Sequence, residues 1–133
     1  MVYFEWTEAL SVGDDGLDAQ HKHLVDIINR LAEGAQAGRE RADVLAVVAE
    51  LKDYVDEHFA AEERYMRDLE YPDLRRHQLE HIQFAQEVAG FDRACRQGGC
   101  TVNHVVLEFL KNWLLSHIAR TDRRYADYAR QRG

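Results

Sequence analysis

The sequence predicts an all-α fold, an antiparallel up-down-up-down four-helix bundle with an extended N-terminal arm. Helix breakers at 11–16 (SVGDDG), 34–40 (GAQAGRE), 71–73 (YPD) and 97–99 (QGG) leave four long segments between them. Within these segments apolar residues recur at steps of three and four, the period of an amphipathic helix, and no strand-like alternation occurs. Because short connections place consecutive helices side by side, neighbouring helices should run in opposite directions.

The first two helices are predicted over 18–34, with Asp18 as the N-cap, and over 41–67. The apolar stripe of the first begins with a histidine and runs through His21, Leu24, Ile28, Leu31 and Ala35. The stripe of the second runs through Val44, Val48, Leu51, Val55, His58, Glu62 and Tyr65. A histidine and a glutamate thus interrupt an otherwise aliphatic stripe.

The other two helices are predicted over 73–95, beginning just after Pro72, and over 102–128. The third stripe opens on two histidines and runs through His77, His81, Phe84, Val88, Phe91 and Cys95. The fourth runs through Val106, Leu110, Trp113 and His117, and the same helix then carries Asp122. Each predicted helix therefore offers at least one residue that can bind a metal.

The bundle topology places these polar residues at one end. The first and third helices carry theirs near their starts, and the second and fourth near their ends, so antiparallel packing brings them to one depth. The two other histidines serve as a control. At about 100° per residue, His23 lies about 200° from His21, and His104 about 220° from His117, so both are predicted to be surface residues.

Two carboxylates belong to this set. Glu62 shares a helix face with His58, and burying its charge costs several kcal/mol unless a cation or a donor compensates it. Asp122 follows His117 by five residues, about 140° around an ideal helix, so it either straddles the stripe or lies where the helix is irregular. Four further acidic residues have no stripe position and are predicted to be ordinary surface charge: Asp56, Glu57, Glu63 and Glu80.

Imidazoles and carboxylates without thiolates suit iron, manganese, zinc or copper. Seven candidate ligands are too many for one ion, whereas two ions bridged by carboxylates account for the number. The candidate ligands are His21, His58, Glu62, His77, His81, His117 and Asp122. Residue types alone leave the identity of the metal open.

Composition limits the other function classes. The 133 residues, 46% of them hydrophobic, are expected to form one domain over 1–133. The net charge of −7 disfavours nucleic acid and anionic lipid as partners. The start of the chain has no leader pattern, and the longest aliphatic run, 44–49, is too short to cross a bilayer, so a cytoplasmic protein is expected. For Cys95 and Cys100 two reduced thiols are favoured, with a local disulfide across Gly98 and Gly99 as the alternative.

Four motifs in a fixed order carry a family resemblance: DAQH ending at His21, HFAAEE from His58, HQLEH from His77 and HIARTD from His117. With WTEALSVG, INRL, YMRDLEYPDL and FLKNWLLSHI around them, they cover nearly the whole chain. The ordered set resembles hemerythrin, and among hemerythrins the single-domain bacterial proteins.

The resemblance implies a centre of two iron ions with an oxo or hydroxo bridge. It implies that His77, His81 and His117 bind one iron, that His21 and His58 bind the other, and that Glu62 and Asp122 bridge them. The second iron is then one ligand short, and dioxygen is expected to bind there. The resemblance also implies which residues line the dioxygen pocket: Phe59, Trp113, Leu114 and Ile118.

The function expected from this resemblance is reversible dioxygen binding by a carrier or store, without enzymatic activity. The alternatives are an oxygen or redox sensor that signals to an unidentified protein partner, and a diiron enzyme that reduces peroxide or nitric oxide. Diiron oxidases of the ferritin type use Glu-x-x-His motifs, and none lies in the predicted stripes. Five neutral imidazoles therefore favour binding over oxygen activation.

Overall fold

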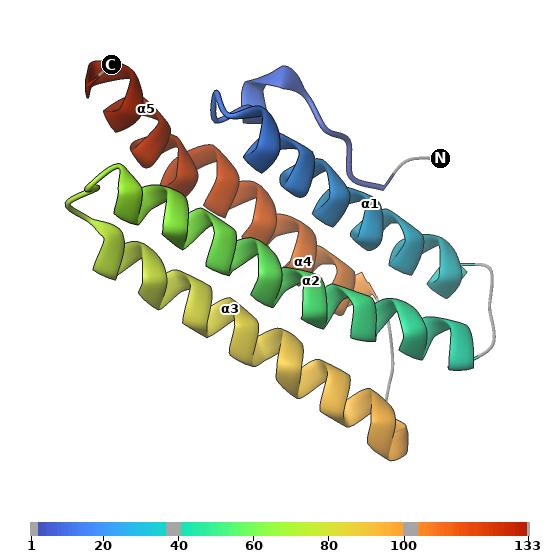
Figure 1. Ribbon diagram of the computed structural model, residues 1–133. Helices are drawn as coiled ribbons and strands as arrows, with labels where there is room; N and C mark the ends of the chain where they lie inside the picture. The colour runs from blue at the N-terminus through green and yellow to red at the C-terminus, as the bar shows by residue number, and fades with distance from the viewer. Residues whose placement is uncertain (1–2, 37–40, 100–103, 133) are drawn as a thin grey trace.

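The computed structural model describes residues 3–36, 41–99 and 104–132, and it is an antiparallel four-helix bundle (Figure 1). Its long helices are α1 (Asp15–Gln36), α2 (Arg41–Asp68) and α3 (Leu74–Ala94), and the fourth rod comprises α4 (His104–Ser116), η3 (His117–Asp122) and α5 (Arg123–Arg132). Short helical turns lie at η1 (Glu8–Leu10) and η2 (Cys95–Gly99). The predicted fold class is confirmed.

The N-terminal arm runs beside α1, and Asn29 of that helix holds it by two hydrogen bonds. The amide of Phe4 donates to Asn29 Oδ1 at 2.7 Å, and Asn29 Nδ2 donates to the Phe4 carbonyl at 2.8 Å. Phe4 itself is buried in the core. The arm therefore covers the bundle instead of extending into solvent.

The start of α1 corrects one prediction. The helix begins at Asp15, and the Leu17 amide donates to Asp14 Oδ1 at 2.9 Å, so Asp14 is the capping residue. Asp18 lies inside the helix and braces the preceding loop, where it accepts hydrogen bonds from the Val12 amide and the Ser11 hydroxyl. The prediction of Asp18 as N-cap is wrong because two aspartates precede it and the earlier one completes the turn.

The fourth rod is one continuous run of helical backbone with a π-helical turn in the middle. The turn covers His117–Asp122, and the residues that flank it keep right-handed helical angles. The sequence predicted one helix over 102–128, with an irregularity near Asp122 as one of two alternatives; residues 102 and 103 lie outside the described part of the chain. A π turn inserts one extra residue into an α-helix, and such turns are frequent at functional sites.

Two hydrophobic clusters fill the bundle. The larger contains Phe4, Leu10, Leu24, Val25, Ile27, Ile28, Leu31, Ala32, Val48, Leu51, Val55, Phe59, Phe84, Val88, Cys95, Leu107, Leu110, Leu114 and Ile118. The smaller contains Val12, Leu17, Met66, Tyr71, Tyr125 and Ala126. The buried histidines and acids belong to neither cluster.

Two further expectations concern membrane spans and cysteines. No helix in the described part of the chain is long and apolar enough to cross a membrane. Cys95 is fully buried and disulfide-bonded, so the favoured expectation of two reduced thiols is wrong. Cys100 lies outside the described residues.

Candidate metal centre

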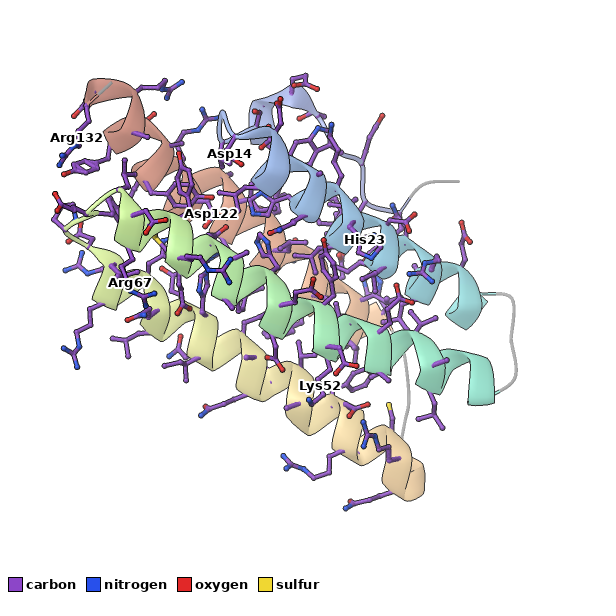
Figure 2. All side chains as sticks on the ribbon, in the orientation of Figure 1. Asp14, His23, Lys52, Arg67, Asp122 and Arg132 are labelled. Carbon is purple, nitrogen blue, oxygen red and sulfur yellow. The ribbon has the colours of Figure 1, made fainter. Side chains whose placement is uncertain are left out.

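The structure brings the seven predicted ligands together at one end of the bundle. They come from α1, α2, α3 and η3, and each is at most 2% exposed: His21, His58, Glu62, His77, His81, His117 and Asp122. Figure 2 shows Asp122 inside the bundle, and His23 lies on α1, where its ring contacts Tyr54 of α2. His23 and His104 are exposed, as their positions off the stripes predicted.

Glu62 connects two groups of histidines. Its Oε1 lies 3.0 Å from His77 Nε2 and 2.9 Å from His81 Nε2. Its Oε2 lies 3.1 Å from His21 Nε2 and 3.3 Å from His58 Nε2. The two oxygens of one carboxylate thus face different sets of imidazoles, which is the arrangement of a bridging ligand.

Asp122 spans the same two groups. Its Oδ1 lies 2.9 Å from His77 Nε2 and 3.0 Å from His117 Nε2, and its Oδ2 lies 3.1 Å from His21 Nε2. The π turn makes this position available, because its wider turn aligns residues five apart, here His117 and Asp122. Of the two explanations for the five-residue step, the irregular helix is the one found.

The donor atoms fit metal ions better than they fit one another. His117 Nε2 lies 3.2 Å from His77 Nε2 and 3.1 Å from His81 Nε2, and neutral imidazoles that share such a point would bring lone pairs together. Donors bound at about 2.1 Å and at right angles lie about 3 Å apart, which matches these separations. The ligand atoms form two groups, each within 4.8 Å: Glu62, His77, His81, His117 and Asp122, and His21, His58 and Glu62. The cluster is suited to hold two ions.

Two buried acids need a compensating cation, which is a second indication of metal. Both carboxylate oxygens of Asp122 are buried, and their polar neighbours are the Nε2 atoms of His21, His77 and His117 at 2.9 to 3.1 Å. Nearby histidines and their charges hold the pKa of Asp122 and that of Glu62 below the ordinary values, although burial alone would raise them. Both acids are therefore ionised at neutral pH.

Three residues that the sequence did not single out hold the outer nitrogens of the histidines. Gln20 Oε1 lies 2.7 Å from His58 Nδ1, and Glu63 Oε2 lies 2.7 Å from His81 Nδ1. Glu80 Oε1 lies 3.0 Å from His117 Nδ1. Since these oxygens accept hydrogen bonds, each Nδ1 carries the proton, and its Nε2 is free for a metal.

The prediction that Glu63 and Glu80 are ordinary surface charge is wrong. Each follows or precedes a predicted ligand directly in the sequence, and each contacts a histidine of a neighbouring helix. That adjacency is the only signal the sequence offers, and it does not say which histidine is reached. Asp56 and Glu57 are exposed, as predicted.

Tyr125 is another residue without a predicted role. Its ring is fully buried, and its hydroxyl donates to Glu62 Oε2 at 3.1 Å. Burial and the charges of Glu62 and Asp122 raise the pKa of this phenol well above its ordinary value. The hydroxyl therefore keeps its proton and remains a donor.

Two of the four predicted pocket residues stack on imidazoles, and the other two are buried in the core. The ring of Phe59 stacks on His81 at 3.8 Å, and that of Trp113 stacks on His117 at 4.5 Å. Leu114 and Ile118 are buried at 2% and 1% exposure. These side chains fix the orientation of two candidate ligands and keep the surroundings apolar. Their role in lining a dioxygen pocket stays a prediction.

Metal uptake by the metal-free protein should strengthen as the pH rises. Burial lowers the pKa of His21, but the hydrogen bonds and charges of Asp122 and Glu62 outweigh it and raise the pKa to about 9. At pH 7 His21 therefore holds a proton that must leave before Nε2 binds a metal. We expect the affinity for Co²⁺ to rise between pH 7 and 9 by roughly tenfold per pH unit for each proton released. Calorimetry in buffers of different ionisation enthalpy measures both quantities, and a flat affinity without proton release would contradict the expectation.

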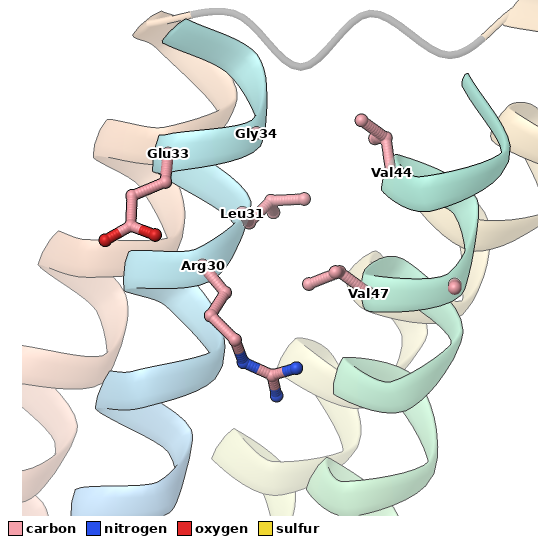
Figure 3. A pocket seen from close by; sticks show the side chains of 7 residues that line it. Arg30, Leu31, Glu33, Gly34, Val44 and Val47 are labelled. Atoms are coloured by element: carbon pink, nitrogen blue, oxygen red, sulfur yellow. The ribbon is translucent and has the colours of Figure 1, made fainter. Parts of the chain in front are cut away.

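A cavity elsewhere in the bundle lacks such chemistry. It is about 370 Å³, lies where α1 ends and α2 begins, and is lined by Arg30, Leu31, Glu33, Gly34, Val44, Ala46 and Val47 (Figure 3). None of these residues is a histidine or a cysteine. The candidate ligands of the same two helices, such as His21 and His58, are not among the residues that line this cavity. The metal cluster remains the candidate site.

Comparison with known proteins agrees with this geometry. Residues 12–129 match the family model "Hemerythrin HHE cation binding domain". The chain is 37% identical over 130 residues to bacteriohemerythrin of Pseudomonas aeruginosa (strain UCBPP-PA14), which covers 98% of this chain and 84% of that protein. It is 32% identical over 126 residues to bacteriohemerythrin of Methylococcus capsulatus (strain Bath), an alignment that covers 94% of this chain and 95% of that protein. A crystal structure of wild-type hemerythrin superposes with a TM-score of 0.88 at 30% identity over 94% of this chain and 96% of that one. The chain belongs to the hemerythrin family.

Proposed function

We propose that this protein binds dioxygen reversibly at a centre of two iron ions and acts as a carrier or store, not as an enzyme. The buried cluster is suited to hold both ions. We assign His77, His81 and His117 to one iron, and His21 and His58 to the other. Glu62 and Asp122 bridge the two, because each carboxylate faces both groups of imidazoles.

The observation that carries the proposal is the unequal division of the imidazoles. With both carboxylates shared, the chain offers three histidines to one position and two to the other. The two-histidine position is therefore one protein ligand short, and an external ligand completes it. When bound, the iron pair supplies the electrons that dioxygen takes up on binding and returns on release.

The surrounding residues favour release of the same molecule that was bound. Phe59 stacks on His81, and Phe59, Leu114 and Ile118 are buried in the apolar core that keeps bulk water away. The nearest phenol, Tyr125, holds its proton towards Glu62, since its pKa is raised well above the ordinary value. A dry pocket that does not readily give up a proton suits binding better than reduction of the ligand.

The composition of the site also favours binding over oxygen activation. Ferritin-like diiron oxidases combine glutamates with Glu-x-x-His motifs, an anionic set that stabilises highly charged iron. Here five imidazoles and two carboxylates converge. The lower negative charge of the ligands suits a pair of iron ions that returns to its reduced state.

Spectroscopy of the iron-loaded protein tests the proposal. The dithionite-reduced protein is examined without oxygen, after oxygen is added and after oxygen is removed, and iron per chain is determined on the same sample. We expect two irons and a charge-transfer band that appears with oxygen and disappears on its removal. A band that persists after removal, with the irons left oxidised, would contradict a carrier and point to a sensor or to a peroxide or nitric oxide reductase.

A further inference from the structure

We propose that the residues behind the ligands give the two metal positions opposite electronic character. Glu63 and Glu80 strengthen the imidazole donors of the three-histidine position, and Tyr125 weakens the carboxylate donor of the two-histidine position. The iron of the three-histidine position then loses its electron first. This inference rests on the ligand assignment of the proposed function and extends it to the order of oxidation.

At the three-histidine position, carboxylates stand behind two of the three rings. Glu63 accepts from His81 Nδ1 at 2.7 Å, and Glu80 accepts from His117 Nδ1 at 3.0 Å. Glu80 is held in place by the Thr121 hydroxyl, which lies 2.9 and 3.1 Å from its two oxygens. A carboxylate on Nδ1–H draws that proton away and makes Nε2 a stronger donor, which stabilises the more highly charged ion.

At the two-histidine position, no carboxylate supports the rings. His58 Nδ1 faces the neutral amide oxygen of Gln20 at 2.7 Å. His21 Nδ1 is buried and has no hydrogen-bond partner among the described residues. These imidazoles are therefore weaker donors than His81 and His117.

Tyr125 acts in the same direction on the bridging carboxylate. Its hydroxyl donates to Glu62 Oε2, the oxygen that faces His21 and His58, and not to Oε1, which faces His77 and His81. A donor on Oε2 takes up negative charge that would otherwise stabilise a ferric ion on that side. The contacts of Glu63, Glu80, Gln20 and Tyr125 thus all favour a ferric ion at the three-histidine position over one at the two-histidine position.

The consequence is an ordered oxidation. When ferricyanide takes one electron from the di-ferrous protein, the electron should come from the iron held by His77, His81 and His117. The iron with the open position stays ferrous until the second electron leaves. The lower of the two midpoint potentials therefore belongs to the three-histidine position, and the higher one to the two-histidine position.

Anaerobic redox titration of the iron-loaded protein tests this order. Glu63→Gln and Glu80→Gln should each raise the lower potential, because a neutral amide stabilises the ferric ion less. Tyr125→Phe should lower the higher potential, because Glu62 Oε2 regains its charge. Since Glu63 and Glu80 act on different rings, either variant alone decides the first point if the other fails to load iron.

The control is Glu57→Gln, which removes the same charge from an exposed residue directly beside His58. It should leave both potentials unchanged. If it shifts them as much as Glu63→Gln does, or if the Gln variants shift neither potential, the proposal is overturned. Iron per chain is measured for every variant. Shifted potentials in a protein that does not bind oxygen reversibly would contradict only the proposed function, and unshifted potentials in a reversible oxygen binder would contradict only this inference.

Discussion

Replacing Glu62 with alanine is expected to empty both metal positions. Each carboxylate oxygen faces a different group of imidazoles, so the substitution removes a ligand from both ions at once. His117→Ala should also lose metal, because it removes one of three imidazoles and releases the Trp113 ring that stacks on it. The iron content of protein expressed in iron-supplemented medium should fall from two ions per chain to near zero for Glu62→Ala.

Two histidines provide the matched control. His23 and His104 are exposed, and their neighbours, Glu50 and the Tyr54 ring for His23 and Glu108 for His104, are not candidate ligands. His23→Ala and His104→Ala should therefore keep the full metal content. Circular dichroism of all four variants should show helix content close to that of the unaltered protein. Metal loss in the His23 or His104 variants with retention in Glu62→Ala would overturn the ligand assignment.

Removing the metals is expected to lower the free energy of unfolding of the protein. A ligand that binds only the folded chain stabilises it by about 4 kcal/mol for each site at a free concentration 1,000 times its Kd. For a chain of this size that corresponds to roughly 10 to 20 °C in Tm for each ion. The metal-free core must also hold two ionised acids that are fully buried, Glu62 and Asp122.

Thermal unfolding before and after dialysis against a chelator measures this effect. The control is Glu62→Ala, whose Tm should not respond to the chelator because it holds no metal to lose. An unaltered protein with the same Tm in both states would show that the cluster contributes to stability without ions.

Much of the fold was predictable because it depends on local periodicity. The steps of three and four in each stripe identified four helices, and antiparallel packing brought His21, His58, His77 and their partners to one depth. Helix ends were less predictable, since capping depends on which of several neighbouring aspartates completes the turn. Asp14 does so here, and Asp18 instead braces the loop before it.

The supports of the site were not predictable, because they depend on contacts between helices. Gln20, Glu63 and Glu80 lie off the apolar stripes of their own helices, and each reaches a histidine on another. The contact of Tyr125 with Glu62 could not be predicted for a different reason. Its position relative to Glu62 follows the π turn, which shifts everything after Asp122 by one residue.

That extra residue also divides the fourth rod between two cores. Before the turn, Leu107, Leu110 and Leu114 belong to the larger hydrophobic cluster; after it, Tyr125 and Ala126 belong to the smaller one. A regular helix would have to present one uninterrupted stripe to both. The π turn frees each half to keep its own rotational setting, so the metal-binding residues occupy the joint between two independently packed blocks. The larger block reaches the site through Phe59, which stacks on His81, and the smaller one through Tyr125, which donates to Glu62, so each block supports the ligands separately.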